Sequence, residues 1–165
     1  MLRSCTVILA LFALCGGAFA ESPTLARIAE TGTIRIGYVP DAPPLSFEDE
    51  DGNVVGYSID LCRHIASAIR FDLGLEKIDI QFKPLVSVED RIGAVVNHDI
   101  DIECGASTVT LSRRERVDFT LMTFITGSAI LSRKGKAIST IDELDKTRVA
   151  VVSGTTTEEV VRRVA

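Results

Sequence analysis

Strand-like and helix-like segments alternate along this 165-residue chain, and this alternation is the feature that most constrains its fold. Residues 33–38, 78–84 and 99–104 alternate apolar and polar side chains or are rich in β-branched residues, which predicts strands. Between them, apolar residues in 58–73 and 88–96 recur at helical spacing. Strands separated by helices are typical of an α/β fold, here with a mixed, mostly parallel sheet flanked by helices.

Turn and capping residues define the ends of these elements. Ser58 and Ser87 are the expected caps of the two central helices, and Gly74 should end the first of them. The pair Asp51 and Gly52 is a strong signal for a hairpin turn. The remaining predicted elements are a helix over 24–30, hairpin strands over 45–48 and 53–55, a helical turn over 112–116, an extended segment over 123–132, a short helix over 141–144, a strand over 148–153 and a helix over 155–164.

The last part of the chain has the pattern of a second α/β unit. Residues 149–152 are all apolar, which is typical of a strand that is buried on both faces, and a helix should follow this strand. The sequence holds no later strand to continue such a sheet. We therefore expect a second domain of which only the start is present.

The first twenty residues have the pattern of a secretory signal peptide. Arg3 supplies a positive charge, and residues 6–14 are apolar but fewer than the roughly 20 that span a bilayer. Ala18 and Ala20 fit the small-x-small cleavage pattern, so we expect cleavage after Ala20 and a periplasmic protein. The alternatives are an uncleaved N-terminal anchor and a lipoprotein modified at Cys15.

The charge balance excludes one class of partner. The chain has 18 Lys and Arg against 23 Asp and Glu, a net charge of −5. Nucleic-acid binders need clustered basic charge in excess, so we expect no nucleic-acid partner.

Two cysteines, Cys62 and Cys104, remain after the expected cleavage. They lie in no CxxC motif and in no Cys/His zinc spacing. We interpret them as small core residues, since Cys62 falls on the apolar face of its predicted helix. A disulfide between them, which an exported protein permits, is the alternative.

Polar residues follow the predicted strand 99–104, and ligands of open α/β sheets bind beyond the carboxyl ends of strands. Ser107 and Thr108 offer hydroxyl groups. Arg113 could form a two-point contact with a carboxylate. A solvated basic turn is the alternative interpretation of Arg113 and the arginines near it.

Other strand ends offer similar groups. Arg91 lies in the first turn of a predicted helix, whose free N–H groups favour anions. Thr155 and Thr156 follow the predicted strand 148–153, but this loop lacks the lysine of a phosphate-binding P-loop. Tyr57 could cover a ligand with its ring. Ordinary capped helices and a packing aromatic are the alternatives.

No signature of catalysis or of a metal site is evident. His64 and His98 lie in no ligand or triad spacing, and the acidic run 48–51 is better explained as a solvated hairpin tip than as a metal site. We find no GxSxG, HExxH or paired-carboxylate signature, so we expect no enzyme and no cofactor.

An ordered series of segments resembles the N-terminal half of extracellular solute-binding proteins of family 3, which deliver polar amino acids to ABC importers. The matching segments are 42–47 (APPLSF), 56–62 (GYSIDLC), 87–96 (SVEDRIGAVV), 99–105 (DIDIECG), 110–120 (TLSRRERVDFT) and 153–160 (SGTTTEEV). The segments GYS, ECG and SGTT are most similar to the glutamate/aspartate-binding subgroup. The resemblance implies a periplasmic-binding-protein-like lobe of type II, a membrane permease complex as partner and a monomer.

The resemblance also implies roles for single residues. Arg113 would bind the α-carboxylate of the ligand, with Thr108 and the backbone at Ala106 adding hydrogen bonds. Arg91 would bind an acidic ligand side chain. Tyr57 would pack on the ligand, and Thr155 or Thr156 would contact it from a second lobe.

Three positions depart from the acidic-ligand subgroup. Val39 and Val88 stand where that subgroup carries a basic residue and a hydroxyl residue, and Ala106 stands where it usually has serine. Each change removes a polar contact. The resemblance therefore implies a polar amino acid as the ligand, and this class includes the acidic amino acids.

The family pattern divides the chain into a signal peptide (1–20), a first ligand-binding lobe (21–122), a hinge or crossing strand (123–135) and the start of a second lobe (136–165). The leading hypothesis is therefore amino-acid capture for an ABC importer, by a truncated chain. Alternatives from other classes are the substrate-binding-like domain of a periplasmic dehydratase or lytic transglycosylase, and the sensor domain of a membrane kinase. The remaining alternative is a truncated chain that lacks a complete binding site and has no function.

Overall fold

The computed structural model describes residues 22–136, 138–145 and 147–164. Its helices and strands, in chain order, are α2 (Pro23–Thr31), β1 (Thr33–Tyr38), β2 (Asp41–Ala42), β3 (Ser46–Glu48), β4 (Val54–Val55), α3 (Tyr57–Asp72), β5 (Asp79–Pro84), α4 (Val88–Val96), β6 (Ile102–Glu103), α5 (Leu111–Arg114), the 3₁₀ helix η2 (Ile141–Leu144) and α6 (Thr156–Val164). The signal peptide expected over residues 1–20 lies outside the described residues.

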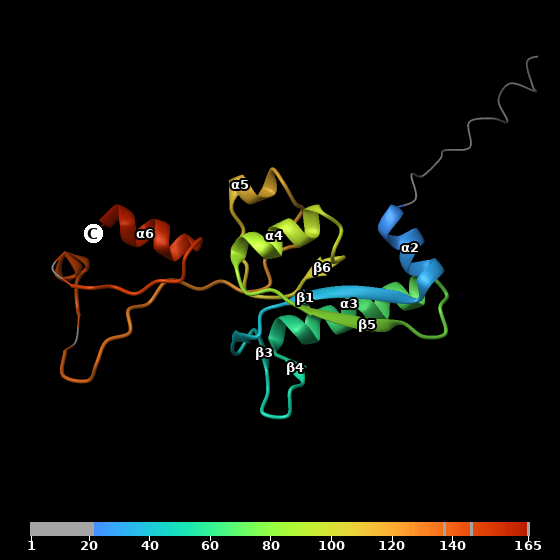
Figure 1. Ribbon diagram of the computed structural model, residues 1–165, viewed down its shortest axis with the longest axis horizontal. Helices are drawn as coiled ribbons and strands as arrows, with labels where there is room; N and C mark the ends of the chain where they lie inside the picture. The colour runs from blue at the N-terminus through green and yellow to red at the C-terminus, as the bar shows by residue number, and fades with distance from the viewer. Residues whose placement is uncertain (1–21, 137, 146, 165) are drawn as a thin grey trace, which may run out of the picture.

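A parallel sheet with the strand order β5-β1-β6 forms the centre of the molecule (Figure 1). Strand β1 pairs with β5 along its whole length, from Thr33 opposite Asp79 to Tyr38 opposite Pro84. On its other edge β1 pairs with β6 at Ile36 and Gly37. The predicted α/β class is confirmed. The strands predicted over 33–38, 78–84 and 99–104 are present, the last of them only over Ile102–Glu103. The antiparallel strands form a separate sheet, in the order β2-β3-β4.

Helices cover both faces of the parallel sheet. Ile34 and Ile36 of β1 are 1% and 0% exposed and pack in a core with α2 and α3, to which Ile28 and Ile59 contribute. On the other face, Leu85 and residues of and after α4 form a second buried cluster. In Figure 1, α3 lies along one side of β1 and β5, and α4 lies on the other side. Burial on both sides fixes the position of β1, and with it the carboxyl end of the sheet.

The start of α3 differs from the prediction that Ser58 caps it. The helix begins at Tyr57, with Gly56 as its N-cap, and no side chain caps it. The N–H groups of Tyr57 and Ser58 instead donate to the carbonyls of Pro44 and Leu45 at 3.0 and 2.9 Å. The backbone of the preceding segment therefore satisfies donors that a capping side chain would otherwise take. Ser87, in contrast, caps α4 as predicted, since its hydroxyl accepts from the N–H of Asp90.

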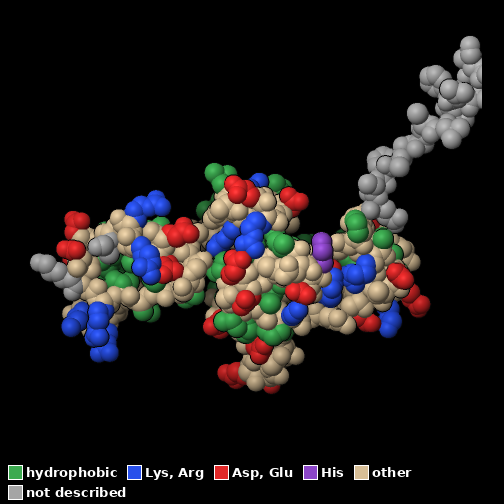
Figure 2. Space-filling model, turned by 45° about the horizontal axis from the view of Figure 1, so that its top comes forward, with side chains coloured by type: hydrophobic (Ala, Val, Ile, Leu, Met, Phe, Trp, Pro, Cys, Tyr) green, Lys and Arg blue, Asp and Glu red, His purple; other side chains and the backbone are tan. Residues whose placement is uncertain are grey.

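The small antiparallel sheet forms a projection from the body. Acidic side chains gather at its tip, as Figure 2 shows at the bottom of the molecule, which fits the prediction of a solvated hairpin. Strand β2 is not among the predicted elements. It pairs through only two residue positions, Asp41 with Phe47 and Ala42 with Ser46.

The segment after residue 122 has little regular structure. The strand predicted over 148–153 is wrong: the described residues there form no strand, and Val149, Val151 and Val152 are 39%, 38% and 71% exposed. An apolar run becomes a strand only where a neighbouring strand pairs with it, and none of the described strands does so. The 123–132 segment is extended and exposed. The assignment of 123–135 as a hinge and of 136–165 as the start of a lobe stays a prediction.

No helix in the described ranges is both long enough and apolar enough to cross a bilayer.

A buried carboxylate ties the parallel sheet to α2. The side chain of Asp101 is 4% exposed and is held by ion pairs with Arg27 and Arg35. Arg35 contributes Nη2 at 2.7 Å and its backbone N–H at 2.8 Å. Burial alone would raise the pKa of Asp101, but the hydrogen bonds from Arg35 and the two positive charges outweigh it, so the pKa is lowered.

This arrangement predicts that Asp101→Asn lowers the free energy of unfolding by about 2 kcal/mol at pH 7, because hydrogen bonds to a charged group are lost. A group with a lowered folded-state pKa stabilises the fold above its unfolded pKa, so the difference should shrink as the pH falls below about 4. Urea unfolding at several pH values measures it. Asp79→Asn, at an exposed position of β5, is the matched control. An equal loss in both variants, or one that does not change with pH, would contradict the assignment.

Candidate functional site

The loop after β6 carries most of the polar groups of the candidate site. The N–H of Cys104 donates to the carbonyl of Gly37 at 2.8 Å, which fixes the loop at the carboxyl end of the sheet. A Cβ on Gly105 would lie 2.6 Å from Cγ2 of Val39, so the close approach of the two segments requires glycine here. Ser107 is half-buried, while Ala106 and Thr108 are exposed.

A disulfide joins this loop to α3. Cys62 and Cys104 are bonded to each other, 42 residues apart in sequence, and both are buried. The prediction of two separate core residues is therefore wrong, and the alternative holds. Helical spacing correctly predicted that Cys62 faces the core. It could not show that Cys104 lies opposite, because the parallel pairing of β6 with β1 is what places Cys104 there.

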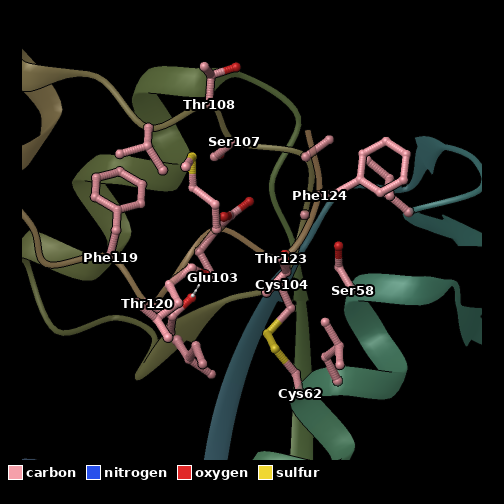
Figure 3. A pocket seen from close by; sticks show the side chains of 18 of the residues that line it. Ser58, Cys62, Glu103, Cys104, Ser107, Thr108, Phe119, Thr120, Thr123 and Phe124 are labelled. Carbon is pink, nitrogen blue, oxygen red and sulfur yellow. Dashed lines mark hydrogen bonds between the residues drawn. A yellow bond between two sulfur atoms is a disulfide. The ribbon is translucent and has the colours of Figure 1, made fainter. Parts of the chain in front are cut away.

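A cavity of about 420 Å³ lies beside the loop. Figure 3 shows Ser107 and Thr108 on one side of it, the disulfide and Ser58 on the other, and Glu103 between them. Residues 117–126 complete the lining. Of the predicted site residues, Ala106, Ser107 and Thr108 line this cavity, whereas the two arginines do not.

Arg91 is buried, with 7% of the residue exposed, although it carries a charge. Its Nε donates to the carbonyl of Ser87 at 3.2 Å, and its Nη1 donates to Oγ of Ser107 at 3.3 Å. The same Nη1 lies 3.8 Å from Oε1 of Glu103. Burial lowers the pKa of Arg91, and Glu103 opposes this effect. The structure therefore brings Arg91 to the loop after β6.

Glu103 also belongs to this cluster, although the sequence pattern indicated it only as part of the segment 99–105 (DIDIECG). It is the last residue of β6, and its side chain is 14% exposed and lies beside Arg91. Burial raises its pKa, and the charge of Arg91 opposes that rise. Two features of the sequence could have indicated Glu103 as a site residue. It lies at the end of a predicted strand, and it is an acidic residue that follows the isoleucines of 99–104.

Arg113 connects the loop after β6 with the segment before α6. Its Nη1 donates to the carbonyl of Thr108 at 2.7 Å, and its Nη2 donates to the carbonyl of Gly154 at 3.4 Å. The hydroxyl of Thr110 caps the short helix α5 and accepts from the N–H of Arg113 at 3.2 Å. A guanidinium has five N–H donors in a planar fork. The half-buried Arg113 therefore keeps N–H groups that could donate hydrogen bonds to a carboxylate.

The other predicted residues lie at the edges of this cluster. The hydroxyl of Tyr57 donates to the carbonyl of Thr123 at 3.0 Å, and its ring is 6.2 Å from that of Phe124. Thr155 uses its hydroxyl to donate to the carbonyl of Val152 and to accept from the N–H of Glu158, as a helix cap does. Thr156 is half-buried at the first position of α6.

The cluster offers charge recognition and hydrogen bonding. Two guanidinium groups, one carboxylate and several hydroxyls surround the carboxyl end of β6. No group of three or more His, Cys, Asp or Glu side chains within the described part of the chain is arranged to hold a metal ion. The arrangement suits a small ligand that carries a carboxylate.

Comparison with known proteins gives a consistent result. The family model of bacterial extracellular solute-binding proteins, family 3, matches residues 34–163. The L-glutamate/L-aspartate-binding protein of Pseudomonas aeruginosa is 36% identical over 140 residues, which are 84% of this chain and 46% of that protein. The chain spans about half the length of the curated relatives that it matches.

Solved structures agree with the fold. An ancestral arginine-binding protein bound to arginine is 34% identical, with a TM-score of 0.71, over 81% of this chain and 56% of that one. An ancestral amino acid-binding protein that is a precursor of cyclohexadienyl dehydratase has a TM-score of 0.75 at 31% identity, over 86% of this chain and 60% of that one. The periplasmic-binding-protein-like fold is thereby confirmed.

The disulfide yields a prediction about stability. Replacing Cys62 and Cys104 together by serine should lower the free energy of unfolding by about 2–4 kcal/mol, because the unfolded chain loses its cross-link. Urea unfolding measures the change. Adding a reductant should lower the midpoint of the wild-type chain and leave the double variant unaffected. Free thiols at both positions in the untreated protein, found by alkylation and peptide mass mapping, would contradict the prediction.

Proposed function

The chain belongs to the bacterial extracellular solute-binding proteins of family 3, and from this premise we propose that it captures a polar amino acid for an ABC importer. Capture needs no covalent chemistry, so the proposal includes no catalytic residue, cofactor or metal. The relatives it matches are named as binding proteins, among them glutamate/aspartate import solute-binding proteins of Salmonella typhimurium and Escherichia coli.

One observation carries the proposal: Arg113 is held at the carboxyl end of β6 by the carbonyls of Thr108 and Gly154. The α-carboxylate is the group that all amino acids share, and a pre-oriented guanidinium binds it through two parallel charge-assisted hydrogen bonds. Because neighbouring carbonyls already fix the side chain, little rotamer freedom is lost when the ligand binds.

Neighbouring groups would complete the ligand contacts. The backbone at Ala106, the hydroxyls of Ser107 and Thr108, and the ring of Tyr57 are within the same region of the fold. Thr155 and Thr156 would act from the side of α6. Each is a proposed ligand contact, and Arg91 is the proposed partner of the ligand side chain.

Two buried valines support a polar rather than a strictly acidic ligand. Val39 is 5% exposed and Val88 is 9% exposed, so neither position offers a polar side chain to the site. Ala106 likewise supplies only its backbone. Arg113 and Arg91 are therefore the two proposed cationic partners of ligand carboxylates.

The setting of the protein follows from the family. We propose export with cleavage after Ala20, a periplasmic monomer, and a membrane permease complex as partner. Residues 21–122 would form the first lobe, 123–135 the connection, and 136–165 the start of the second lobe, whose closure on the first would bury the ligand.

A thermal-shift panel of the common amino acids on the exported chain tests the proposal. A ligand that binds only the folded state raises the midpoint as its concentration increases, so one or a few polar amino acids should do so. An unchanged midpoint with every amino acid, in a chain that melts cooperatively, would overturn the proposal.

The role of Arg113 yields a second prediction. Arg113→Gln should weaken binding of the amino acid that gives the largest shift by about tenfold or more, because a bidentate charge-assisted contact is lost. Arg114→Gln changes the charge equally at the next, exposed position of α5 and should leave the Kd within about twofold. Titration calorimetry measures both. Equal effects would identify Arg113 as part of a solvated basic turn.

A further inference from the structure

The Cys62–Cys104 disulfide lies directly beside the loop proposed to hold the ligand. Cys104 is the residue before the loop residues 105–108, which include three proposed ligand contacts. Both cysteines line the same cavity as this loop. In Figure 3 the disulfide lies on the opposite side of the cavity from Ser107 and Thr108. The cross-link is therefore part of the wall of the site as well as part of the core.

The other end of the cross-link lies in α3, the helix that begins with Tyr57. Cys62 is in the second turn of this helix. Ile59 and Ala66 are both 0% exposed, so α3 is packed firmly against the sheet. The disulfide thus joins the two elements that carry Tyr57 and the loop after β6. It holds these proposed ligand contacts at a separation that the protein sets before any ligand binds.

The arginine hydrogen bonds that hold the same loop involve groups that the ligand also needs. Nη1 of Arg91 donates to Oγ of Ser107 at 3.3 Å, and Nη1 of Arg113 donates to the carbonyl of Thr108 at 2.7 Å. These two guanidinium groups are the proposed partners of ligand carboxylates. The loop and the ligand would therefore share their N–H groups, whereas the cross-link to α3 uses no group that a ligand contacts.

Glu103 adds hydrogen bonds inside the loop. Its carboxylate accepts from the side chain of Ser107 and from the backbone of Gly105. Glu103 directly precedes Cys104 in the chain, so these bonds shape the loop without joining it to α3. The disulfide supplies that connection covalently.

We propose that the Cys62–Cys104 disulfide positions the loop after β6 for ligand binding, so that reduction of the cross-link weakens amino-acid affinity while the chain stays folded. The inference rests on the proposed function and concerns affinity, not stability. A loop that is free to move loses conformational entropy when it orders around a ligand, and a cross-linked loop has lost this entropy already. The loss of affinity should therefore apply to every amino acid that binds.

Reduction of the cross-link is a thiol–disulfide exchange. A dithiol attacks the disulfide, the bond between the two sulfur atoms breaks, and Cys62 and Cys104 become thiols. The dithiol supplies the two electrons and two protons and closes to its own disulfide. A disulfide oxidant takes back both and re-forms the bond, so the change in affinity should be reversible.

Titration calorimetry with the amino acid that gives the largest thermal shift tests this proposal. The samples are the untreated chain, the same chain reduced with dithiothreitol, and the double variant Cys62→Ala/Cys104→Ala, each shown by circular dichroism to be folded at the temperature used. We expect the Kd to rise by about tenfold or more in the reduced chain and in the variant, because the ligand must then order the loop. Reoxidation with oxidised glutathione should restore the original Kd.

Two controls separate positioning from stability. Ile28 is 1% exposed in α2, which lies at the opposite end of β1 from the loop (Figure 1). Ile28→Ala destabilises the core as loss of a disulfide does, but it should leave the Kd within about twofold. Dithiothreitol should not change the Kd of the double variant. If the double variant does not fold, Cys62→Val/Cys104→Ala replaces part of the lost volume and takes its place.

The outcomes distinguish the two proposals. An unchanged Kd in the reduced chain and in the double variant would overturn the positioning role and leave amino-acid binding intact. An equal rise in Ile28→Ala would also overturn it, because a general loss of stability would explain the result. If no amino acid binds even to the untreated chain, the proposed function fails, and the positioning role fails with it.

Discussion

The pairing of β1 with β5 and β6 is the interaction on which the remaining structure depends. Parallel strands end at the same edge of a sheet, so this pairing brings together loops that are far apart in the sequence. The loop after β6 reaches Arg91 only because β6 lies beside β1 and α4 packs against the same sheet. Burial of Ile34 and Ile36 on β1 holds the arrangement, since a shift of one residue would turn the apolar side chains of the strand to the opposite face.

Local signals in the sequence predicted most of the helices and strands around the parallel sheet. Strand β1 was predicted with its observed bounds, and Ser87 caps α4 as its position indicates, because alternation and capping depend on neighbouring residues alone. The N-cap of α3 was misplaced by two residues, at Ser58 instead of Gly56, since the carbonyls of Pro44 and Leu45 replace the expected cap. The strand over 148–153 failed for a related reason: its apolar pattern is local, but a strand also needs a partner strand.

The site could be predicted only in part. Features that depend on neighbouring residues were predicted, whereas contacts between residues far apart in the sequence were not. Strand ends indicated where a ligand could bind, and the structure places Arg91, Ser107, Thr108 and Arg113 around one loop. The Cys62–Cys104 bond and the pairing of Glu103 with Arg91 each join elements that only the tertiary fold brings together. No spacing rule reports such contacts, so a sequence pattern identifies the candidate groups and leaves their partners open.

The position of Arg91 shows why the chemistry of a residue does not by itself give its role. As a free guanidinium at a helix start, Arg91 would favour a ligand carboxylate, which is what the pattern suggested. In the fold it is buried, it donates to Oγ of Ser107, and it already faces a carboxylate of the protein. The same side chain therefore also positions the loop after β6, a role that its place at a helix start did not indicate.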